Sequence, residues 1–591
     1  MTTIMKNNLA AWGLVLAGLI AYSAGTYAYN TPTLGPAEDK SFKDPANVDL
    51  LTGLPNFTKT DLAIGNGKLK LEHTFSSSAG WFAGFYDISL SRIEIRPYSS
   101  CCNQAYVRLG QSIEVFEQNT SGTYSSTSYK GGKLTVTQNE KIYTNRDGVS
   151  LISKTGELTK IVQPNGFTMY LDGANDRVST NNGLSFYYKR RSTSPYRVKK
   201  ITAVNNAFDY CSGSQGSCSF DYSWPASTYK WPEDGNISNG EYTFEATNAE
   251  GVTTKYVQKK YTDPHQNKLY TRIVRVYDNG SLLPTQEYDY YLFESCADGG
   301  AGNFYWSCSG YNYYVDTATV GGITFSYFMN LNTGVYGYAN GRSESELGNS
   351  GISNTTYKGG RPTTSSSYWP SGNASYDTNS PSNRITSTKD KGIDYDFEYD
   401  GRGNITKRTQ NPISTDANLT LPAVVLEAGY PSSCSNIKTC NKPNWVKDGN
   451  GGITYYSYHG QSGEIRKIIL PPNDQGLSPA THFEYTKKFA KFYDPVSGSL
   501  KTDTVGIWLL TKKVDCLSKS ASTATESDCR ASDKVTTTYS YGSSSGVNNL
   551  WLTEQVVTST DGSVRRTCYE YDRLGNQIGI IEPNANLDSC S

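Results

Sequence analysis

Few residues of this chain have the types and spacing that catalysis needs. It has four histidines, and none has a cysteine or carboxylate at a spacing typical of a metal site or catalytic triad: they are His73, His265, His459 and His482. The segment Gly542-Ser543-Ser544-Ser545-Gly546 matches the pattern of a nucleophile elbow, which needs a strand before the serine and a helix after it. Here strand-like residues 538–541 lead through a serine-rich turn toward another strand, so we expect no elbow.

Two further patterns fail in similar ways. Gly65-Asn66-Gly67-Lys68 lacks the first glycine of a phosphate-binding loop. Asp396, Glu398 and Asp400 could form a carboxylate pair for glycoside hydrolysis, but they alternate with aromatic residues and so belong to the solvated side of a strand. The sequence therefore predicts no enzyme, no cofactor and no metal.

The strand that carries these acids belongs to a repeat. In Ile393-Asp394-Tyr395-Asp396-Phe397-Glu398-Tyr399-Asp400-Gly401-Arg402-Gly403-Asn404, apolar or aromatic residues alternate with acids up to a turn. This period of two predicts a strand with one packed face and one wet face. Cys568-Tyr569-Glu570-Tyr571-Asp572-Arg573-Leu574-Gly575-Asn576 repeats the Tyr-Asp-x-x-Gly-Asn spacing.

Looser copies have one more residue in the turn. They are Tyr458-His459-Gly460-Gln461-Ser462-Gly463 and Tyr493-Asp494-Pro495-Val496-Ser497-Gly498, and Tyr277-Asp278-Asn279-Gly280 is a further candidate. We expect the Asp to cap the turn, the Gly to take the left-handed backbone conformation and the Tyr ring to cover the sheet. The residues that carry the repeat are Tyr399, Asp400, Gly403, Asn404, Tyr458, Gly463, Tyr493, Asp494, Gly498, Tyr571, Asp572, Gly575 and Asn576.

On these motifs the chain resembles the YD-repeat, or RHS-repeat, family of secreted or cell-surface bacterial proteins. The resemblance covers roughly residues 140–591, because hairpin-like segments such as 143–151, 156–161, 165–170 and 184–204 look like the degenerate hairpins that precede the repeats in such proteins. It implies a very long β-sheet that spirals into a hollow shell, which in some members encloses a toxic C-terminal domain. The Asp- and Pro-containing core segment of such members is not recognisable here. We therefore expect a partial or truncated member whose repeats do not close a shell by themselves.

Composition agrees with an all-β fold that has little dry core. Hydrophobic residues make up 36% of the 591-residue chain and 46 tyrosines outnumber 19 phenylalanines and 9 tryptophans, so much of the apolar area carries a hydroxyl and tolerates water. Only 19% of residues are charged, which argues against disorder. Lys plus Arg equals Asp plus Glu at 55 each, and Lys189-Arg190-Arg191 is short, so we expect no nucleic-acid partner.

The N-terminus predicts export. Lys6 precedes the uncharged segment 9–24, and Thr26-Tyr27-Ala28 offers small residues for a signal peptidase, so residues 1–28 read as a signal peptide. A retained membrane anchor is the alternative, since residues 9–27 almost reach the length that spans a bilayer. We expect no membrane domain after cleavage and a secreted or cell-envelope location, extracellular or periplasmic.

Twelve cysteines in an exported chain indicate disulfides. Their spacing suggests short loop-closing pairs, with Cys101 and Cys102 bonded to each other or to other partners. The candidate pairs are Cys211–Cys218, Cys296–Cys308, Cys434–Cys440, Cys516–Cys529 and Cys568–Cys590. Zinc is the rival interpretation, which the absence of paired two-residue spacings disfavours.

These observations divide the chain into four parts: a signal peptide at 1–28, an N-terminal β-domain at 29–140, degenerate hairpins at 141–390 and the repeats at 391–591. The function we expect is that of a non-catalytic scaffold in cell contact or toxin delivery, with an effector domain as partner. The alternative is an adhesin that binds cell-surface glycans, in which rings such as Trp306 and Trp369 stack on sugars.

Overall fold

The computed structural model describes the chain between residues 47 and 590. Its gaps are residues 50–53, 77–91, 98–101, 110–111, 128–130, 155–156, 173–175, 191–196, 212–217, 233–236, 239, 263–268, 298–306, 321–322, 331–334, 341–352, 359–360, 368–370, 377–384, 391–392, 413–421, 496, 520–524 and 586. Strands dominate the described residues, which confirms the predicted all-β class. No helix among them is long and apolar enough to cross a membrane.

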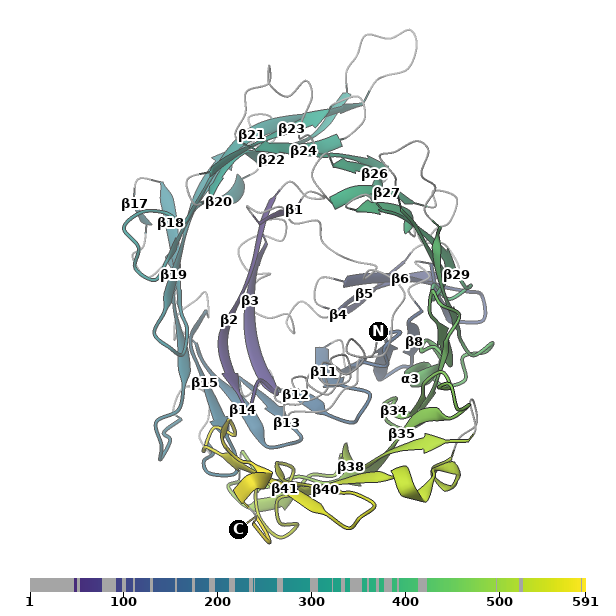
Figure 1. The fold of residues 1–591 in the computed structure, drawn as a ribbon. Coiled ribbons are helices and arrows are strands. Elements are labelled where there is room, and N and C mark those ends of the chain that lie inside the picture. The colour runs from purple at the N-terminus through teal and green to yellow at the C-terminus, as the bar shows by residue number, and fades with distance from the viewer. Residues whose placement is uncertain are drawn as a thin grey trace.

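One large sheet forms a closed ring (Figure 1). Its strands follow one another in chain order, and neighbours pair antiparallel. The first half consists of β8 (Lys133–Val136), β9 (Glu140–Thr144), β10 (Ser150–Lys154), β11 (Glu157–Val162), β12 (Thr168–Asp172), β13 (Arg177–Thr180), β14 (Leu184–Arg190), β15 (Val198–Asn205), β16 (Ala226–Lys230), β17 (Ile237–Ser238), β18 (Glu241–Thr247), β19 (Thr253–Thr262), β20 (Leu269–Asp278), β21 (Gln286–Ala297), β22 (Ser307–Val320), β23 (Ile323–Asn330) and β24 (Val335–Asn340).

The second half of the ring continues without a break in pairing across residue 390, where β28 pairs with β29. It consists of β25 (Ser353–Lys358), β26 (Arg361–Ser367), β27 (Ser371–Tyr376), β28 (Ile385–Asp390), β29 (Ile393–Tyr399), β30 (Ile405–Pro412), β31 (Val424–Gly429), β32 (Trp445–Lys447), β33 (Ile453–Tyr458), β34 (Ile465–Ile469), β35 (Ser478–Lys488), β38 (Ile507–Ser518), β39 (Val535–Tyr541), β40 (Leu552–Thr558), β41 (Val564–Tyr571) and β42 (Gln577–Ile581). The degenerate hairpins thus supply much of the wall, and the repeats alone do not close it. The predicted domain boundaries stay predictions.

Short elements interrupt the ring. Strand β35 pairs directly with β38, because β36 (Lys491–Tyr493) and β37 (Leu500–Thr502) form a hairpin of their own. The described helices are single turns: α3 (Ile437–Cys440), η3 (Glu526–Asp528), η4 (Ala531–Asp533) and η5 (Pro583–Ala585).

Two small N-terminal sheets lie inside the ring (Figure 1). The first contains β1 (Val48–Asp49), β2 (Leu54–Ile64) and β3 (Leu69–Ser76), and we call its β2–β3 pair the inner hairpin. The second contains β4 (Arg92–Pro97), β5 (Asn103–Leu109), β6 (Ser112–Gln118) and β7 (Tyr124–Ser126).

The largest core forms where the inner hairpin covers the wall. Leu62, Ile64 and Leu69 are buried against residues of β14, β15 and later strands up to β22. The Phe57 ring lies 6.0 Å from that of Tyr256, the largest fully buried side chain. Burial of this kind contributes roughly 1.5–3 kcal/mol per large apolar side chain. The hairpin therefore supplies the second layer that a single curved sheet lacks.

The second small sheet packs on the start of the ring. The ring centroids of Phe116 and Tyr143 lie 6.0 Å apart, edge to face. Beside them the carboxylate of Glu114, which is 2% exposed, accepts hydrogen bonds from the Tyr143 hydroxyl at 2.8 Å and the Ser126 hydroxyl at 2.7 Å. A buried carboxylate needs such donors. This contact raises the pKa of Tyr143 through burial and the nearby Glu114 charge.

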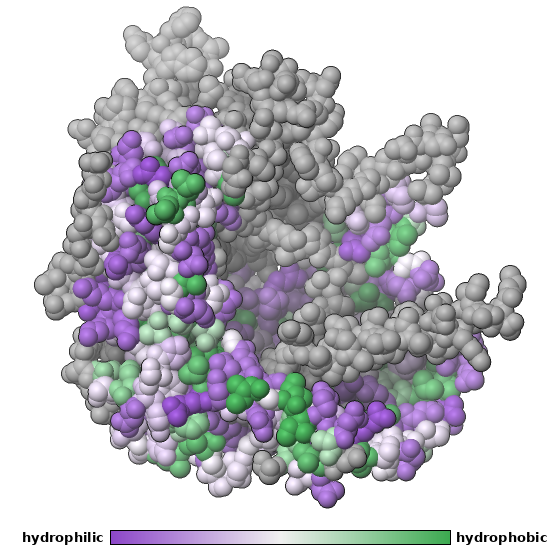
Figure 2. All heavy atoms as spheres, turned by 60° about the vertical axis from the view of Figure 1, so that its left-hand side comes forward, coloured by the Kyte–Doolittle hydropathy of each residue, from purple (hydrophilic) through white to green (hydrophobic). Residues whose placement is uncertain are grey.

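Tyrosine hydroxyls also form hydrogen bonds with the backbone of the ring strands. Tyr485 donates to the carbonyl of Ile465 at 2.8 Å, and Tyr541 donates to that of Leu510 at 2.7 Å. Each ring therefore covers the sheet while its hydroxyl is satisfied by a backbone acceptor. In the space-filling view, hydrophilic residues predominate on the described surface and apolar residues form small groups (Figure 2).

Candidate functional site

The turn after Tyr399 is built around the side chain of Asp400. Its Oδ1 accepts hydrogen bonds from the backbone amides of Arg402 and Asn404, both at 2.9 Å. Its backbone amide donates to the carbonyl of Asn404 at 2.9 Å, and Gly403 has a φ of 88°. The left-handed position explains the glycine, because other L residues are strained there.

The turn after Tyr571 has the same geometry. Asp572 Oδ1 accepts from the Asn576 amide at 2.8 Å, the Asp572 amide donates to the Asn576 carbonyl at 2.9 Å, and Gly575 has a φ of 78°. We call this arrangement the Tyr-Asp turn.

In both turns the final asparagine reaches a distant part of the chain. The side-chain oxygen of Asn404 accepts from the guanidinium of Arg146 at 2.7 Å. That of Asn576 accepts from the backbone amide of Asn66 at 3.2 Å, and the Asn66 side chain accepts in return from the Gln577 amide at 2.8 Å. The turns thus join the repeats to N-terminal segments. We call the contacts between residues 59–210 and residues 400–577 the seam.

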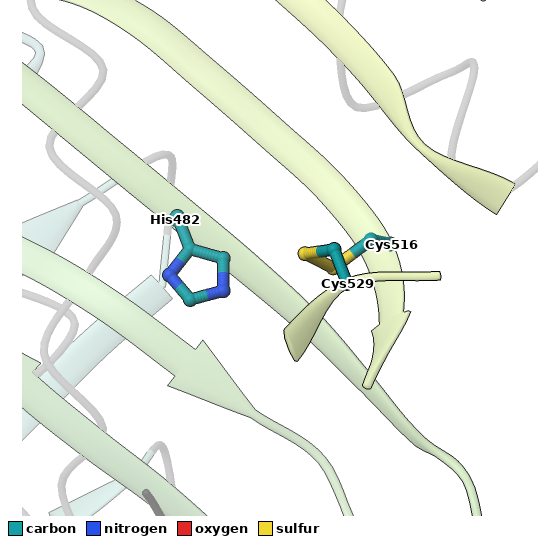
Figure 3. Close-up of side chains that lie close together, drawn as sticks. All are labelled: His482, Cys516 and Cys529. Atoms are coloured by element: carbon teal, nitrogen blue, oxygen red, sulfur yellow. A yellow bond between two sulfur atoms is a disulfide. The ribbon is translucent and has the colours of Figure 1, made fainter. Parts of the chain in front are cut away.

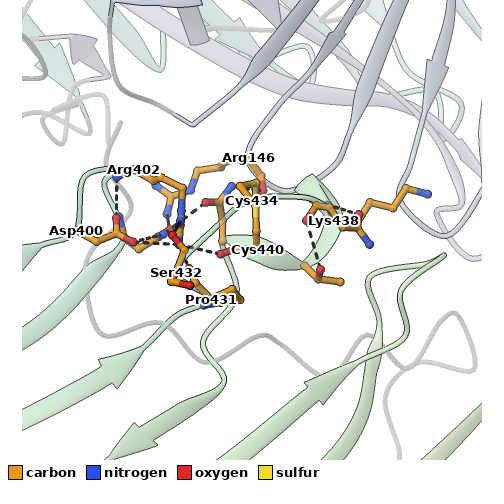
Figure 4. The surroundings of a disulfide bond; sticks show 12 residues. Arg146, Asp400, Arg402, Pro431, Ser432, Cys434, Lys438 and Cys440 are labelled. Atoms are coloured by element: carbon orange, nitrogen blue, oxygen red, sulfur yellow. Dashed lines mark hydrogen bonds and ion pairs between the residues drawn. A yellow bond between two sulfur atoms is a disulfide. The ribbon is translucent and has the colours of Figure 1, made fainter.

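A group of hydrogen bonds and one ion pair around Arg402, which we call the Arg402 cluster, lies beside the Cys434–Cys440 disulfide (Figure 4). The guanidinium of Arg402 donates to the carbonyls of Pro431 at 2.5 Å and Ser432 at 3.3 Å, and lies 3.3 Å from Asp400. These bonds fix the loop that leads into α3.

Helix α3 contributes a contact across the seam through Lys438. Lys438 Nζ donates to the carbonyl of Pro164, in the first part of the ring, at 2.9 Å, and to that of Gln461 at 2.7 Å. Burial lowers the pKa of Lys438, and the nearby Lys487 lowers it further.

Of the two looser repeats, the one at Tyr458 contacts the α3 segment and the one at Tyr493 lies at the seam. A Cβ on Gly463 would meet the Lys438 carbonyl at 2.7 Å. The Tyr493 amide donates to the Asn206 carbonyl at 2.8 Å, and a Cβ on Gly498 would meet the Tyr210 ring. Each loop has one residue more than the Tyr-Asp turn, as the sequence indicates. Asp494 caps its turn through the Ser497 amide at 2.9 Å and forms an ion pair with Lys501 at 2.5 Å. The Tyr458 hydroxyl donates to the Pro443 carbonyl at 2.8 Å.

At Tyr277-Asp278-Asn279-Gly280 the acid binds the inner hairpin and makes no contact at the seam among the described residues. Asp278 forms an ion pair with Lys59 of the inner hairpin and accepts from Thr254 Oγ1 at 3.1 Å. Burial is the largest single influence on the Asp278 pKa and raises it. Hydrogen bonds from Lys59, Thr254 and Thr285 and the charge of Lys59 together outweigh burial, so the pKa is lowered.

Several turns with the same backbone bonds lack the Tyr-Asp pair. One of them, at Asn145, lies in a segment predicted as a degenerate hairpin, and the sequence pattern did not predict the others as repeat turns. In each, the first residue carries the capping side chain and the fourth is a glycine with positive φ. They begin at Asn119, Asn145, Asn248, Asp448 and Asn473. Asn or Asp followed three residues later by Gly is the sequence pattern that would have predicted these turns, since Asn and Asp both cap the turn through their side chains.

Four of the predicted cysteine pairs lie at disulfide distance. The Cα atoms are 5.3 Å apart in Cys211–Cys218, 5.0 Å in Cys434–Cys440 and 5.5 Å in both Cys516–Cys529 and Cys568–Cys590. Cys296 and Cys308 are opposite each other in the β21–β22 register, and their side chains lie outside the described part of the structure. Cys102 is disulfide-bonded, and Cys101 lies outside the described residues.

One cluster resembles a metal site in composition. His482 lies beside Cys516 and Cys529, with the possible ligand atoms within 4.8 Å of one another (Figure 3). The two sulfurs are bonded to each other and so offer no thiolates. Strand pairing of β35 with β38 brings the histidine there, which the sequence spacing did not suggest.

The other candidate catalytic groups are engaged in local contacts. Asp396 accepts from the Asn411 amide at 2.8 Å, and Glu398 pairs with Lys407 at 2.7 Å. The serine-rich turn at 542–546 connects β39 to β40, both strands. Residues 1–28, Trp306 and Trp369 lie outside the described residues.

No protein-family profile and no curated protein matches the chain. A crystal structure of TcdB2-TccC3-Cdc42 aligns at 12% identity over 90% of this chain and 24% of that chain, with a TM-score of 0.32. The Photorhabdus luminescens Tc holotoxin pore aligns at 10% identity over 87% of this chain and 27% of that chain, with a TM-score of 0.24. The chain spans about a quarter of these solved chains. Such TM-scores carry no argument about function.

Proposed function

We propose that the chain is a secreted or cell-surface scaffold of the YD-repeat type, without catalytic activity, that acts in toxin delivery or contact between cells. An effector, fused in longer relatives or encoded separately, supplies any chemistry. The observation that supports this most is the closed ring whose last repeat turn bonds to the tip of the inner hairpin, at Asn576 and Asn66.

Several features favour a container or scaffold over an enzyme. The inner hairpin and the second small sheet occupy part of the ring interior and bury the wall's apolar residues there. The carboxylates that could pair for catalysis at Asp396 and Glu398 are held by Asn411 and Lys407. Disulfides close several loops, which suits an oxidising compartment.

Limited proteolysis of the native protein tests this proposal. We expect one resistant core that retains both the inner hairpin and the repeats, with nicked pieces that elute together in size-exclusion chromatography and separate only after denaturation and reduction. Release of short, independently folded domains under native conditions would contradict a single scaffold. Intact mass of the native secreted protein distinguishes its two forms: a mass near 65.0 kDa less the signal indicates a stand-alone scaffold, and a much larger mass indicates a toxin carrier with a fused effector.

A further inference from the structure

An open cavity of about 380 Å³ lies at the seam, where three distant parts of the chain meet. Lys68 comes from the tip of the inner hairpin and Phe167 from the loop between β11 and β12. Glu464, Ile507 and Leu550 come from the repeats. The size is typical of small-molecule sites.

One side of the cavity is apolar. Ile507 and Leu550 are buried in one cluster, and Phe167 and Leu509 pack against it. The polar residues Gln163 and Asn182 line other parts of the cavity. An apolar wall with a few polar groups that fix orientation is the usual composition of a ligand site.

The amine of Lys68 is the unusual feature. Among the described residues it makes no ion pair or hydrogen bond, and its recorded contact is with the Trp551 ring, whose centroid lies 4.2 Å from Nζ. Burial lowers the pKa of Lys68 to about 8. Lys68 is half-buried, and partial removal of a cation from water without an anionic partner has a free-energy cost that a ligand anion would offset.

Glu464 is the other charged residue in the described lining. Burial raises the pKa of its carboxyl, while the nearby charge of Lys442 lowers it. The described lining thus carries one lysine and one glutamate, and the charge of Lys442 lies near the glutamate.

We propose that this cavity binds a small organic carboxylate, with its carboxylate on Lys68 and its apolar body against Phe167, Ile507, Leu509 and Leu550. The site goes beyond the scaffold function and does not depend on it. Since its walls come from the inner hairpin and from both ends of the ring, an occupied cavity also links the three segments.

Isothermal titration calorimetry on the full chain at pH 7 tests the proposal. The probes are octanoate, 3-phenylpropionate and indole-3-propionate, each compared with its neutral amide. We expect saturable binding of at least one acid and at least about tenfold weaker binding of its amide, because only the acid pairs with the amine.

Lys68→Gln should weaken binding of the acid by a similar factor. Lys70→Gln, two residues further along at the start of β3 but exposed and paired with Glu72, should leave it within about twofold.

Three outcomes would overturn the proposal: no binding of any acid up to its solubility limit, equal binding of acid and amide, or unchanged binding by the folded Lys68→Gln variant. If that variant does not fold by circular dichroism, the comparison of acid with amide on the unmodified chain decides the matter.

Discussion

The side-chain oxygen of Asn404 lies 2.7 Å from the guanidinium nitrogen of Arg146, a residue 258 positions earlier in the chain. Asn576, its counterpart in the second Tyr-Asp turn, bonds to Asn66 across 510 positions. The last residue of the motif thus connects the repeat to the start of the ring at Arg146 or to the inner hairpin at Asn66, while the Asp and Gly shape the turn locally.

Replacing Asn404 by Ala should destabilise the protein by about 1–3 kcal/mol. The side chain is fully buried, accepts from Arg146 and donates to Asp400 at 2.8 Å, so its loss leaves buried groups without these partners. Urea unfolding at pH 7 measures the change. The matched control is Asn450→Ala, in the related turn at Asp448, where the asparagine side chain is exposed. It should cost less than about 0.5 kcal/mol. Equal losses in the two variants would show that the seam bond contributes nothing.

Glycine at position 575 is required twice, by conformation and by space. Gly575→Ala places a Cβ 2.4 Å from the Trp551 ring and 3.3 Å from the Gly65 Cα, at a φ of 78°. Gly562→Ala has a similar φ of 80° and nothing within 4 Å. We expect about 1 kcal/mol of backbone strain in both and a further loss of about 1–3 kcal/mol from overpacking in Gly575→Ala alone. Parallel thermal and urea unfolding gives the difference, and similar stabilities would refute the packing term.

The disulfide that closes the longer loop should contribute more to the free energy of unfolding. In the chain-entropy model, Cys434–Cys440, with a separation of 6, is worth about 2–3 kcal/mol, and Cys568–Cys590, with a separation of 22, about 3–4 kcal/mol. We expect double Ser variants of each pair to follow that order in urea unfolding. Peptide mapping without reductant checks the pairing itself. If removal of Cys434–Cys440 also disrupts the hydrogen bonds of Arg402 beside it, the double Ser variant of that pair becomes the less stable of the two and the order is reversed.

The sequence predicted the strands and turns well where the pattern is local. The alternation before Asp400 and the Tyr-Asp-x-x-Gly-Asn spacing define a strand and a capped turn through neighbouring residues. Alternation shows that one face is packed but not what covers it, so the placement of Leu62 and Ile64 inside the ring could not be foreseen. The turn at Asn145 was seen only as a degenerate hairpin, because Asn replaces Asp as the cap. The approach of His482 to Cys516 depends on strand register, which the spacing along the chain does not encode.

The half-buried amine of Lys68 makes stability depend on pH in a defined direction. Its pKa falls to about 8 in the folded protein from 10.5, because burial disfavours the charged form. Between pH 8 and 10.5 the unfolded chain binds more protons at this site, so this contribution to stability rises with pH; the penalty is fully present below pH 8. Lys68→Met removes the penalty at every pH. Since Lys68 keeps some solvent contact, we expect the variant to gain about 1–2 kcal/mol relative to the unmodified chain at pH 7, and the gap to shrink between pH 8 and 10.5. Urea unfolding at pH 7, 8, 9 and 10 measures the gap, with exposed Lys70→Met as the control that should show no such trend. A gap that stays constant from pH 7 to 10 would mean that the amine is not desolvated by the seam.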